Sequence, residues 1–305
     1  MLGKLDGLEI DKEILVNNIE GKTEIVGKIF SSDYFFKIPY YQRPFAWDED
    51  NFNRLIDDLI SAIGEQQYFL GTLVLHKKDD KGNYDVVDGQ QRLTSLLILT
   101  ACLRDLIDDA KFKSQLQSKI IQEENKVDGI PAKARIEVKD RSIFNEMVLS
   151  QEGTKIPKKV TDLAEPENRY LIAIKIFQDK LRAYGQDFLQ RFSQFVNQKC
   201  VMIYLSTTSF DDAFKLFTIV NDRGKQLRRI DILKAQNISP DVVPIESVRD
   251  RLAQVWESLE KNLGESTLES ILHMMRLIYV KEKPQEDLYS EFEKRIFFQV
   301  ERVYL

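Results

Sequence analysis

The chain has 305 residues, of which 43% are hydrophobic and 30% are charged, with a formal net charge of −5. This length and apolar content suffice for one large or two ordinary domains, each with its own core. The acidic balance argues against a domain that grips nucleic acid through many phosphates, so any such contact would need a local basic patch.

No apolar run approaches the roughly 20 residues that span a bilayer, and the first residues show no signal-peptide pattern. The two cysteines, Cys102 and Cys200, lie in apolar surroundings. We therefore expect buried free thiols, no membrane contact and a cytoplasmic protein.

The first third of the chain predicts mixed α/β structure. Helical spacing of apolar residues follows an acidic helix start at Asp48, and a turn-rich segment at residues 79–83 separates two apolar runs. In chain order we expect a strand at 34–38, a helix from 48 to 63, a hairpin of strands 68–76 and 84–87, and a long apolar helix from 90 to about 109.

Beyond residue 110 the pattern becomes mostly helical. We expect an amphipathic helix from 111, a short strand at 134–138, an exposed loop at 150–157 and an isolated strand at 199–205. The remaining helical candidates are 165–190, 211–220, 230–237, 246–263, 268–281 and 285–300. The prediction is an α+β protein with an α/β unit over residues 1–110 and a mainly helical domain over residues 111–305.

The most informative segment is residues 88–94, Asp-Gly-Gln-Gln-Arg-Leu-Thr, where a strand breaks at Gly89 and a helix begins. The first N–H groups of a helix lack intrahelical partners and favour an anion, and Arg92 adds a permanent cation. The alternative is structural: Asp88 and Gln91 have the spacing of a capping box, in which Gly89 relieves a turn and Arg92 is solvated.

A second polar segment, Ile38–Trp47, interleaves aromatic residues with Gln42 and Arg43. Such a segment could stack on a base while Arg43 meets a phosphate. Alternatively, Pro39 and Pro44 stiffen a loop whose aromatic side chains fill the core.

A third segment, residues 221–227, lies between two expected helices. Asn221, Arg223 and the nearby Lys234 present an amide and two cations on one connection. The structural alternative is a helix–turn–helix junction in which Gly224 ends the first helix.

These segments together resemble the N-terminal domain of GmrSD-type modification-dependent restriction proteins. That family shows I-P-x-Y-Q-R-x-Y-x-W, a Tyr-Phe-Leu-Gly strand, D-G-Q-Q-R-L-T, and F-x-x-x-N-x-R-G-x-x-L followed by D-x-x-K. The corresponding segments here are Ile38–Trp47, Tyr68–Gly71, Asp88–Thr94, Phe217–Leu227 and Asp231–Lys234. The resemblance covers roughly residues 20 to 240. Phe45 replaces the second Tyr, and Arg228 or Arg229 stands where a small helix-capping residue is common.

The resemblance implies a fold related to ParB and sulfiredoxin, and a domain that binds or hydrolyses a nucleoside triphosphate with Mg²⁺. It also implies control of an HNH-type nuclease domain or subunit in a restriction and anti-phage system. The implied catalytic residues are Asp88, Gln90, Gln91 and Arg92. The implied nucleotide-binding residues are Tyr41, Gln42, Arg43, Gly89, Thr94, Asn221, Arg223 and Lys234.

An alternative of another class is a non-catalytic module that reads modified DNA, with Tyr41 or Trp47 holding an extruded base. We expect no nuclease site in this chain, because its two histidines, His76 and His273, lie far apart in unlike contexts. The sequence leaves open the metal ligands, the preferred nucleotide and a homo-oligomeric state.

Overall fold

The computed structural model divides the chain into two compact units. The first unit runs through Ile38 and from Pro44 to Phe217, and the second comprises Pro39–Arg43 and the chain from Thr218 onward. The expected boundary near residue 110 falls inside the first unit. The structure describes residues 19–39, 41–42, 44–138, 141–156, 166–221, 229–238, 242–283 and 288–297.

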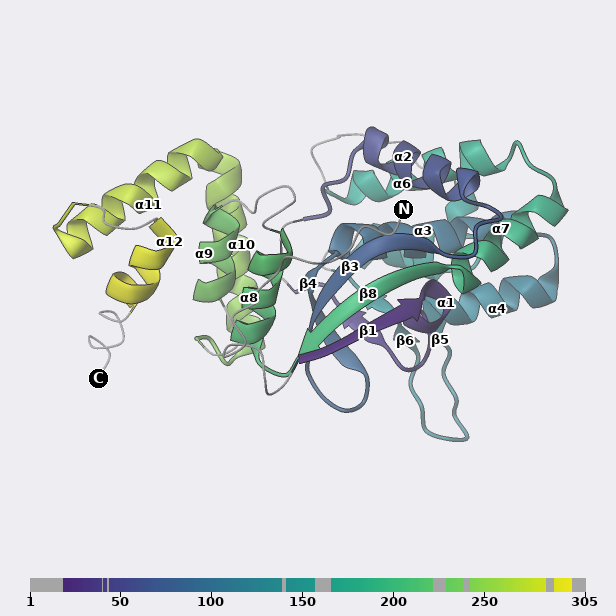
Figure 1. The fold of residues 1–305 in the computed structure, drawn as a ribbon, viewed down its shortest axis with the longest axis horizontal. Coiled ribbons are helices and arrows are strands. Elements are labelled where there is room, and N and C mark those ends of the chain that lie inside the picture. The colour runs from purple at the N-terminus through teal and green to yellow at the C-terminus, as the bar shows by residue number, and fades with distance from the viewer. Residues whose placement is uncertain are drawn as a thin grey trace. The chain divides into compact units, whose positions relative to one another are not determined.

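The first unit is built on a mixed six-stranded sheet in the order β1-β8-β3-β4-β2-β7, and β5 and β6 form a separate small hairpin (Figure 1). The strands are β1 (Ile19–Ile25), β2 (Phe35–Lys37), β3 (Tyr68–Lys77), β4 (Asn83–Asp88), β5 (Ile121–Gln122), β6 (Lys133–Ala134), β7 (Ile136–Glu137) and β8 (Cys200–Thr207). The predicted hairpin of β3 and β4 is confirmed by their antiparallel pairing.

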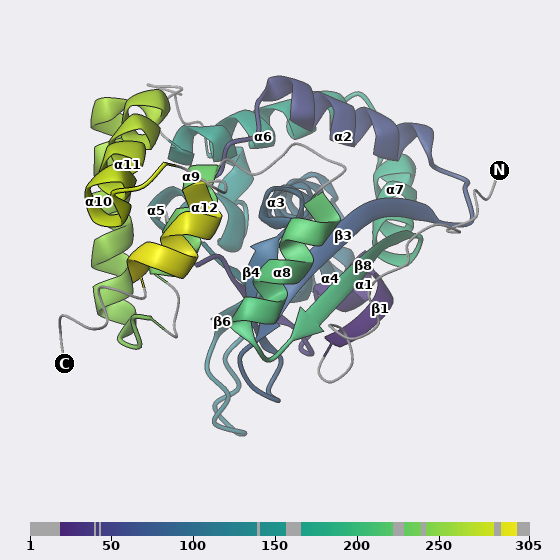
Figure 2. The same ribbon diagram turned by 60° about the vertical axis from the view of Figure 1, so that its left-hand side comes forward.

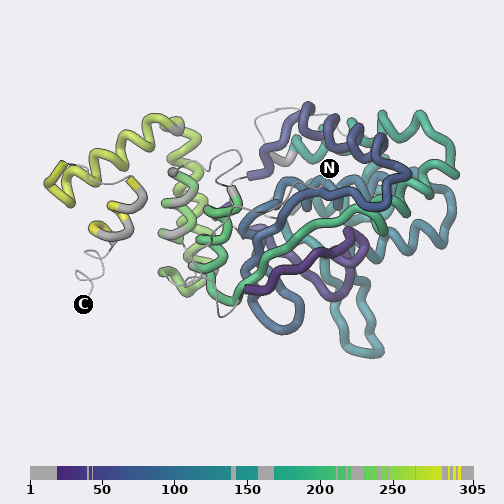
Figure 3. Tube along the Cα trace, in the orientation of Figure 1, coloured from purple at the N-terminus to yellow at the C-terminus, as the bar shows by residue number. Residues whose placement is uncertain are grey.

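Strand β8 is an interior strand of this sheet, between β1 and β3, whereas the sequence pattern predicted an isolated strand. It pairs antiparallel with β1 and parallel with β3, and Figure 3 shows its green trace running between them. Cys200, Met202 and Tyr204 alternate along the strand and are buried in the core of the unit. The prediction was wrong because both partner strands lie more than a hundred residues away in sequence.

Helix α3 is the buried helix of the first unit, as its apolar sequence predicted. It contacts α4, α6 and α7, and Figure 2 shows it among the helices beside the sheet. Because a helix that is apolar on all sides avoids water, this position is the expected one. The helices of the unit are α1 (Val26–Ile29), α2 (Glu49–Ser61), α3 (Gln90–Leu106), α4 (Ala110–Ile120), α5 (Arg141–Phe144), α6 (Pro166–Leu181), α7 (Gln186–Gln198) and α8 (Phe210–Asn221), which contains the unit boundary.

Helix α2 begins as its acidic start predicted. The side chain of Asp48 accepts a hydrogen bond from the N–H of Asn51, whose own side chain accepts one from the N–H of Asp48. This reciprocal cap fixes the first residue of the helix. Phe52, Leu55, Ile56 and Leu59 are buried, in agreement with the helical spacing of the sequence.

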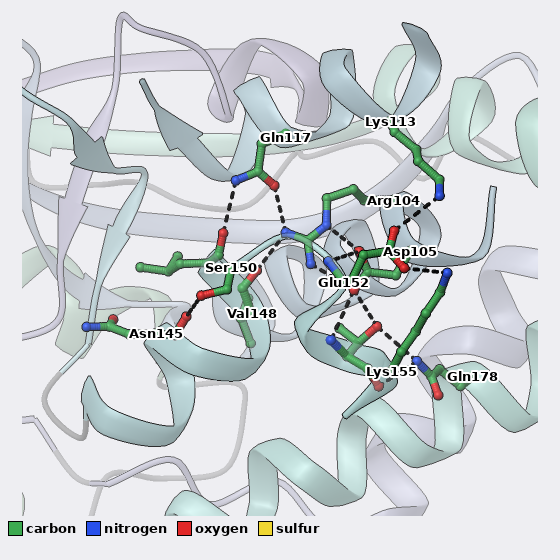
Figure 4. Close-up of polar contacts among 12 residues, drawn as sticks. Arg104, Asp105, Lys113, Gln117, Asn145, Val148, Ser150, Glu152, Lys155 and Gln178 are labelled. Carbon is green, nitrogen blue, oxygen red and sulfur yellow. Dashed lines mark hydrogen bonds and ion pairs between the residues drawn. The ribbon is translucent and has the colours of Figure 1, made fainter. Parts of the chain in front are cut away.

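A buried ion pair at the end of α3 organises residues 145–155, which form a π-helical turn (Asn145–Leu149) and a 3-10 turn (Gly153–Lys155) (Figure 4). Arg104 donates to both carboxylate oxygens of Asp105, at 2.6 and 2.8 Å. Asp105 also accepts hydrogen bonds from the N–H groups of Glu152 and Thr154 and from the Thr154 hydroxyl. The expected exposed loop at 150–157 was therefore wrong for Thr154, which this carboxylate holds in the interior.

The second unit is helical within its described residues. Its helices are α9 (Arg229–Asn237), α10 (Glu246–Leu263), α11 (Glu265–Val280), α12 (Leu288–Glu291) and a π-helical turn (Phe292–Phe297). Its core contains Ile230, Leu233, Leu268, Leu272, Leu288, Phe292 and Ile296. A buried ion pair between Arg276 and Glu291 joins α11 to α12. The mixed sheet and the many helices together confirm the predicted α+β class.

Candidate functional site

The turn between β4 and α3 requires glycine for two reasons. Gly89 has φ 87° and ψ 6°, in the left-handed region that L-residues with a side chain rarely adopt. A Cβ atom at this position would also lie 2.4 Å from Cδ2 of Leu73 and 3.1 Å from the carbonyl oxygen of Thr72. The predicted strand–glycine–helix transition is thus confirmed, with β4 ending at Asp88 and α3 beginning at Gln90.

The alternative in which Asp88 and Gln91 form a capping box is wrong. Gly89 is itself the N-cap residue, and it has no side chain with which to cap the first turn of α3. The left-handed glycine moves the cap by one residue, so the third helical position belongs to Arg92 and not to Gln91. A helix start with a glycine N-cap, at the positive end of the helix dipole, favours an anionic ligand.

Gln91 instead fastens the preceding loop. Its Oε1 accepts hydrogen bonds from the N–H groups of Ala46 (2.8 Å) and Trp47 (3.1 Å), and its Nε2 donates to the carbonyl of Pro44 (3.3 Å). From α6, Nη1 of Arg169 donates to the carbonyls of the same Ala46 and Trp47, at 3.0 and 3.2 Å. Residues 44–47, which we call the clamped loop, are thereby held by two side chains.

Arg92 is half-buried and has few polar partners for its positive charge among the described residues. Its Nη1 lies 3.5 Å from the carbonyl oxygen of Thr72, at the limit for a hydrogen bond, and it forms no ion pair with any described residue. Burial lowers the pKa of its guanidinium, which the charge of Asp88 partly opposes. An arginine remains cationic under these conditions, so this site holds a partly desolvated cation beside an anion-favouring helix start.

Glycine at position 71 makes room for this cation. A Cβ atom there would lie 2.5 Å from Nη1 and 2.8 Å from Cζ of Arg92. Gly71 has φ 110° and lies where the pairing of β3 with β8 shifts register between Phe69 and Thr72. The bulge in β3 and the missing side chain together provide the space in which the guanidinium lies.

The remaining residues of the segment differ in access. Asp88 is half-buried, Gln90 is 7% exposed and Thr94 is 2% exposed. The burial of Thr94 leaves its hydroxyl little access to a ligand, whereas Asp88 and Arg92 are partly exposed.

The aromatic residues of the clamped loop pack inside the first unit. The ring of Phe45 lies 5.8 Å from that of Phe52 and 5.0 Å from that of Tyr170, and Trp47 packs edge-on against Phe52. For Phe45 and Trp47 the packing interpretation of this segment is therefore confirmed.

The other predicted residues lie in the second unit or outside the described residues. Tyr41 is buried and Gln42 is half-buried, and both belong to the second unit. In that unit Lys234 is 2% exposed, and its Nζ lies 3.0 Å from Oε1 of Glu257, a contact that already places its charge. Asn221 ends α8, with no description of its side chain. Arg43, Arg223 and Gly224 lie outside the described residues, so the approach of both arginines to Arg92 stays a prediction.

Two contributors to this site were missed from the sequence. Arg169 reads as a solvated residue near the start of a helix, and it meets the clamped loop across more than a hundred residues of sequence. Gly71 was visible as a glycine inside a strand, which is a known sign of a bulge or a close approach. That sign could have suggested a partner side chain, although not its identity.

The fold and this turn define an α+β domain. In it, strand β4 ends before Gly89, the buried helix α3 begins after Gly89, and Arg92 places a cation in the first turn of α3. The family model of the GmrSD restriction endonuclease, N-terminal domain, matches residues 23–238. The chain belongs to this family and is therefore a domain of a restriction and defence protein. No curated protein matches the chain. Among the helices that the structure describes, none is long and apolar enough to cross a membrane.

Proposed function

We propose that the chain binds a nucleoside triphosphate at the β4–α3 turn. The phosphates lie against the first-turn N–H groups of α3, and the guanidinium of Arg92 meets a phosphate oxygen. The observation that carries this proposal is that Arg92 is half-buried, forms no ion pair with a described residue, and lies beside a helix start whose N-cap residue is a glycine. Phosphate supplies the charge that this arrangement lacks.

Magnesium fits the same proposal as a companion of the nucleotide. Mg²⁺ in proteins is bound through one or two carboxylates together with substrate phosphates, and it neutralises phosphate charge during transfer. The described residues contain no group of three or more His, Cys, Asp or Glu side chains that could hold a metal by themselves. Asp88, at the end of β4, is the residue that we assign to a metal arriving with the nucleotide.

The two glutamines take different roles in this proposal. Gln91 engages both the oxygen and the nitrogen of its side-chain amide in the clamped loop, so it acts by holding this loop in place. Gln90 is the residue that we assign to orienting an attacking water molecule if the nucleotide is hydrolysed. The nucleotide state then controls an HNH-type nuclease partner within the restriction system that the family defines.

Binding of a labelled nucleoside triphosphate to the purified chain, with phosphate release measured in parallel, tests this function. Arg92→Ala removes the cation and should weaken binding at least about tenfold, as expected for a lost charge-assisted contact. The matched control is Arg191→Ala, because Arg191 is exposed and its one partner among the described residues is a backbone carbonyl of its own helix. Equal affinity in the Arg92 variant would contradict the site.

The alternative function, reading of modified DNA without catalysis, predicts a different result in the nucleotide-binding assay. Nucleotide would then not bind, and the chain would shift modified duplex more strongly than plain duplex in a gel assay. The dependence of that affinity on salt would report how many phosphates are contacted.

A further inference from the structure

A second group of cations lies in the first unit, on elements other than the β4–α3 turn. Lys28 lies in α1, Lys119 in the last turn of α4, and Arg135 between β6 and β7. The three residues, which we call the α4 cation cluster, are separated by up to about a hundred positions in sequence. The fold brings them together, because Lys119 bonds to the carbonyl of the residue before Lys28 and Arg135 bonds to the carbonyl of the residue before Lys119.

Arg135 is the buried member of the cluster, with 5% of its surface exposed. Its Nε and Nη2 donate to the carbonyl oxygen of Ser118, at 3.3 and 3.2 Å, and its Cζ lies 4.9 Å from the centre of the Phe35 ring. Its Nη1 is buried and has no hydrogen-bond partner in the described part of the chain. A buried donor without a partner costs about 1–3 kcal/mol, so such a donor is uncommon unless something else satisfies it.

Lys119 is half-buried, and its Nζ donates to the carbonyl oxygen of Gly27 at 2.6 Å. The pKa of this ammonium is lowered first by burial and then by the positive charges of Arg135 and Lys28. The ammonium thus lies in a positive field and has a neutral carbonyl as its partner.

Neither Lys119 nor Arg135 forms an ion pair with a described residue, although buried charges in proteins are normally paired. The carboxylate that acts on Arg135 is that of Asp33, which is exposed and hydrogen-bonded to Lys28. The C-terminal end of α4 contributes a partial negative charge of about one half. This charge is too small to balance Lys119 and Arg135 in the presence of Lys28.

We propose that the α4 cation cluster binds a phosphate-type oxyanion, held by the ammonium groups of Lys28 and Lys119 with the guanidinium of Arg135 behind them. A tetrahedral oxyanion accepts several hydrogen bonds from different directions, which suits donors carried by three separate elements. The anion is either a free phosphate or a phosphate of a nucleic-acid backbone, since the two share this chemistry.

Thermal unfolding in potassium phosphate, compared with potassium chloride at equal ionic strength, tests the proposal. A ligand that binds the native state raises the melting temperature, so phosphate should raise it by several degrees in the wild-type chain. Lys119→Gln should lose most of that rise, and Lys28→Gln, at a more exposed position, should lose part of it. The control is Lys113→Gln, on the same helix, whose lysine pairs with Glu152 and which should keep the whole rise.

The outcome also separates this cluster from the nucleotide site. The rise in melting temperature that depends on Lys119 should persist in Arg92→Gln. This holds whether or not a nucleotide binds at the β4–α3 turn. If Lys119→Gln lowers the melting temperature equally in phosphate and in chloride, the lysine serves only to bond to the Gly27 carbonyl, and the proposal is overturned. The proposal is also overturned if the wild-type chain shows no phosphate-specific rise.

A short DNA duplex identifies the source of the anion. If the anion is a backbone phosphate, duplex binds to the wild-type chain, and Lys119→Gln reduces the salt slope of that binding by about one. If the anion is a free phosphate, inorganic phosphate stabilises the chain and the variant leaves duplex binding unchanged. Each result supports the oxyanion site and assigns its ligand.

Discussion

The guanidinium of Arg92 occupies the space that a side chain at Gly71 would fill: a Cβ atom at residue 71 would lie 2.5 Å from the Nη1 atom of the arginine. The contact joins the bulge of β3 to the first turn of α3. The position of the only cation that we assign to phosphate binding in this turn therefore depends on the absence of a side chain on a neighbouring strand.

Gly71→Ala should displace the Arg92 guanidinium and weaken nucleotide binding. The clash is with the flexible end of a side chain, so its cost in stability is small beside the backbone strain of φ 110°, about 1–3 kcal/mol. Gly64→Ala is the matched control, because Gly64 has φ 104° and a Cβ there would meet nothing within 4 Å. Both variants should lose similar stability, and only Gly71→Ala should lose affinity. Equal affinities in the two variants would separate Gly71 from the site.

Gln91→Ala should release the clamped loop. The variant removes the acceptor of two backbone N–H groups, which should cost about 1–3 kcal/mol of stability. The amides of Ala46 and Trp47 should then exchange with deuterium faster than in the wild-type chain. Gln115→Ala, at an exposed position of α4, should leave both the stability and this exchange unchanged. Unaltered exchange at Ala46 in the Gln91 variant would show that Arg169 holds the loop alone.

Asp105→Asn should be strongly destabilising, by about 3–5 kcal/mol, because it leaves the buried Arg104 guanidinium without its counter-ion. Chemical denaturation measures this loss. Asp57→Asn is the control: its carboxylate forms an exposed pair with Lys180, so the change should stay within about 0.5 kcal/mol. Comparable losses in the two variants would contradict a structural role for the buried pair.

Acidification should also remove the stability that the buried Arg104–Asp105 pair contributes. Although burial by itself raises the pKa of Asp105, the hydrogen bonds and charge of Arg104 and the bonds from Thr154 outweigh it and lower the pKa from its ordinary value of 3.8. A carboxylate with a lowered folded-state pKa stabilises the fold above its unfolded pKa, and this stability is lost as the pH falls through the folded-state value. Unfolding free energy should therefore fall below about pH 4 in the wild-type chain, and this acid-dependent part should shrink in Asp105→Asn.

The two thiols should be unreactive in the folded protein. Cys102 and Cys200 are both free and fully buried, as the sequence predicted. Burial raises the pKa of Cys200 to about 12, so almost no thiolate is present near neutral pH. A thiol reagent at pH 8 should report no fast-reacting group in the native chain and two groups after denaturation. One rapidly modified cysteine in the native chain would contradict this burial.

Local features of the sequence predicted much of the first unit. The spacing of Phe52, Leu55 and Leu59 predicted the buried face of α2, and the run of apolar residues after Arg92 predicted the buried helix α3. The break of the strand at Gly89 before the helix was also predicted, and the positive φ found there explains the glycine. Each of these features depends on residues close together in the chain.

Contacts between distant residues could not be predicted in the same way. The pairing of β8 with β1 and β3, the contact of Arg169 with the clamped loop, and the burial of Thr154 beneath Asp105 all join residues far apart in sequence. A polar residue such as Thr154 carries no local sign of burial, since its partner carboxylate lies on another element. The capping-box pattern of Asp88 and Gln91 shows the reverse error, in which a local motif is overruled by the left-handed glycine that follows the strand.

Hydrogen–deuterium exchange with and without a saturating nucleoside triphosphate and Mg²⁺ tests the binding site most directly. Phosphates bound at the β4–α3 turn should slow exchange of the backbone amides of residues 89–92, and Arg92→Ala should abolish this protection. Exchange at these amides that does not change with nucleotide, or protection confined to other segments of the chain, would contradict the account.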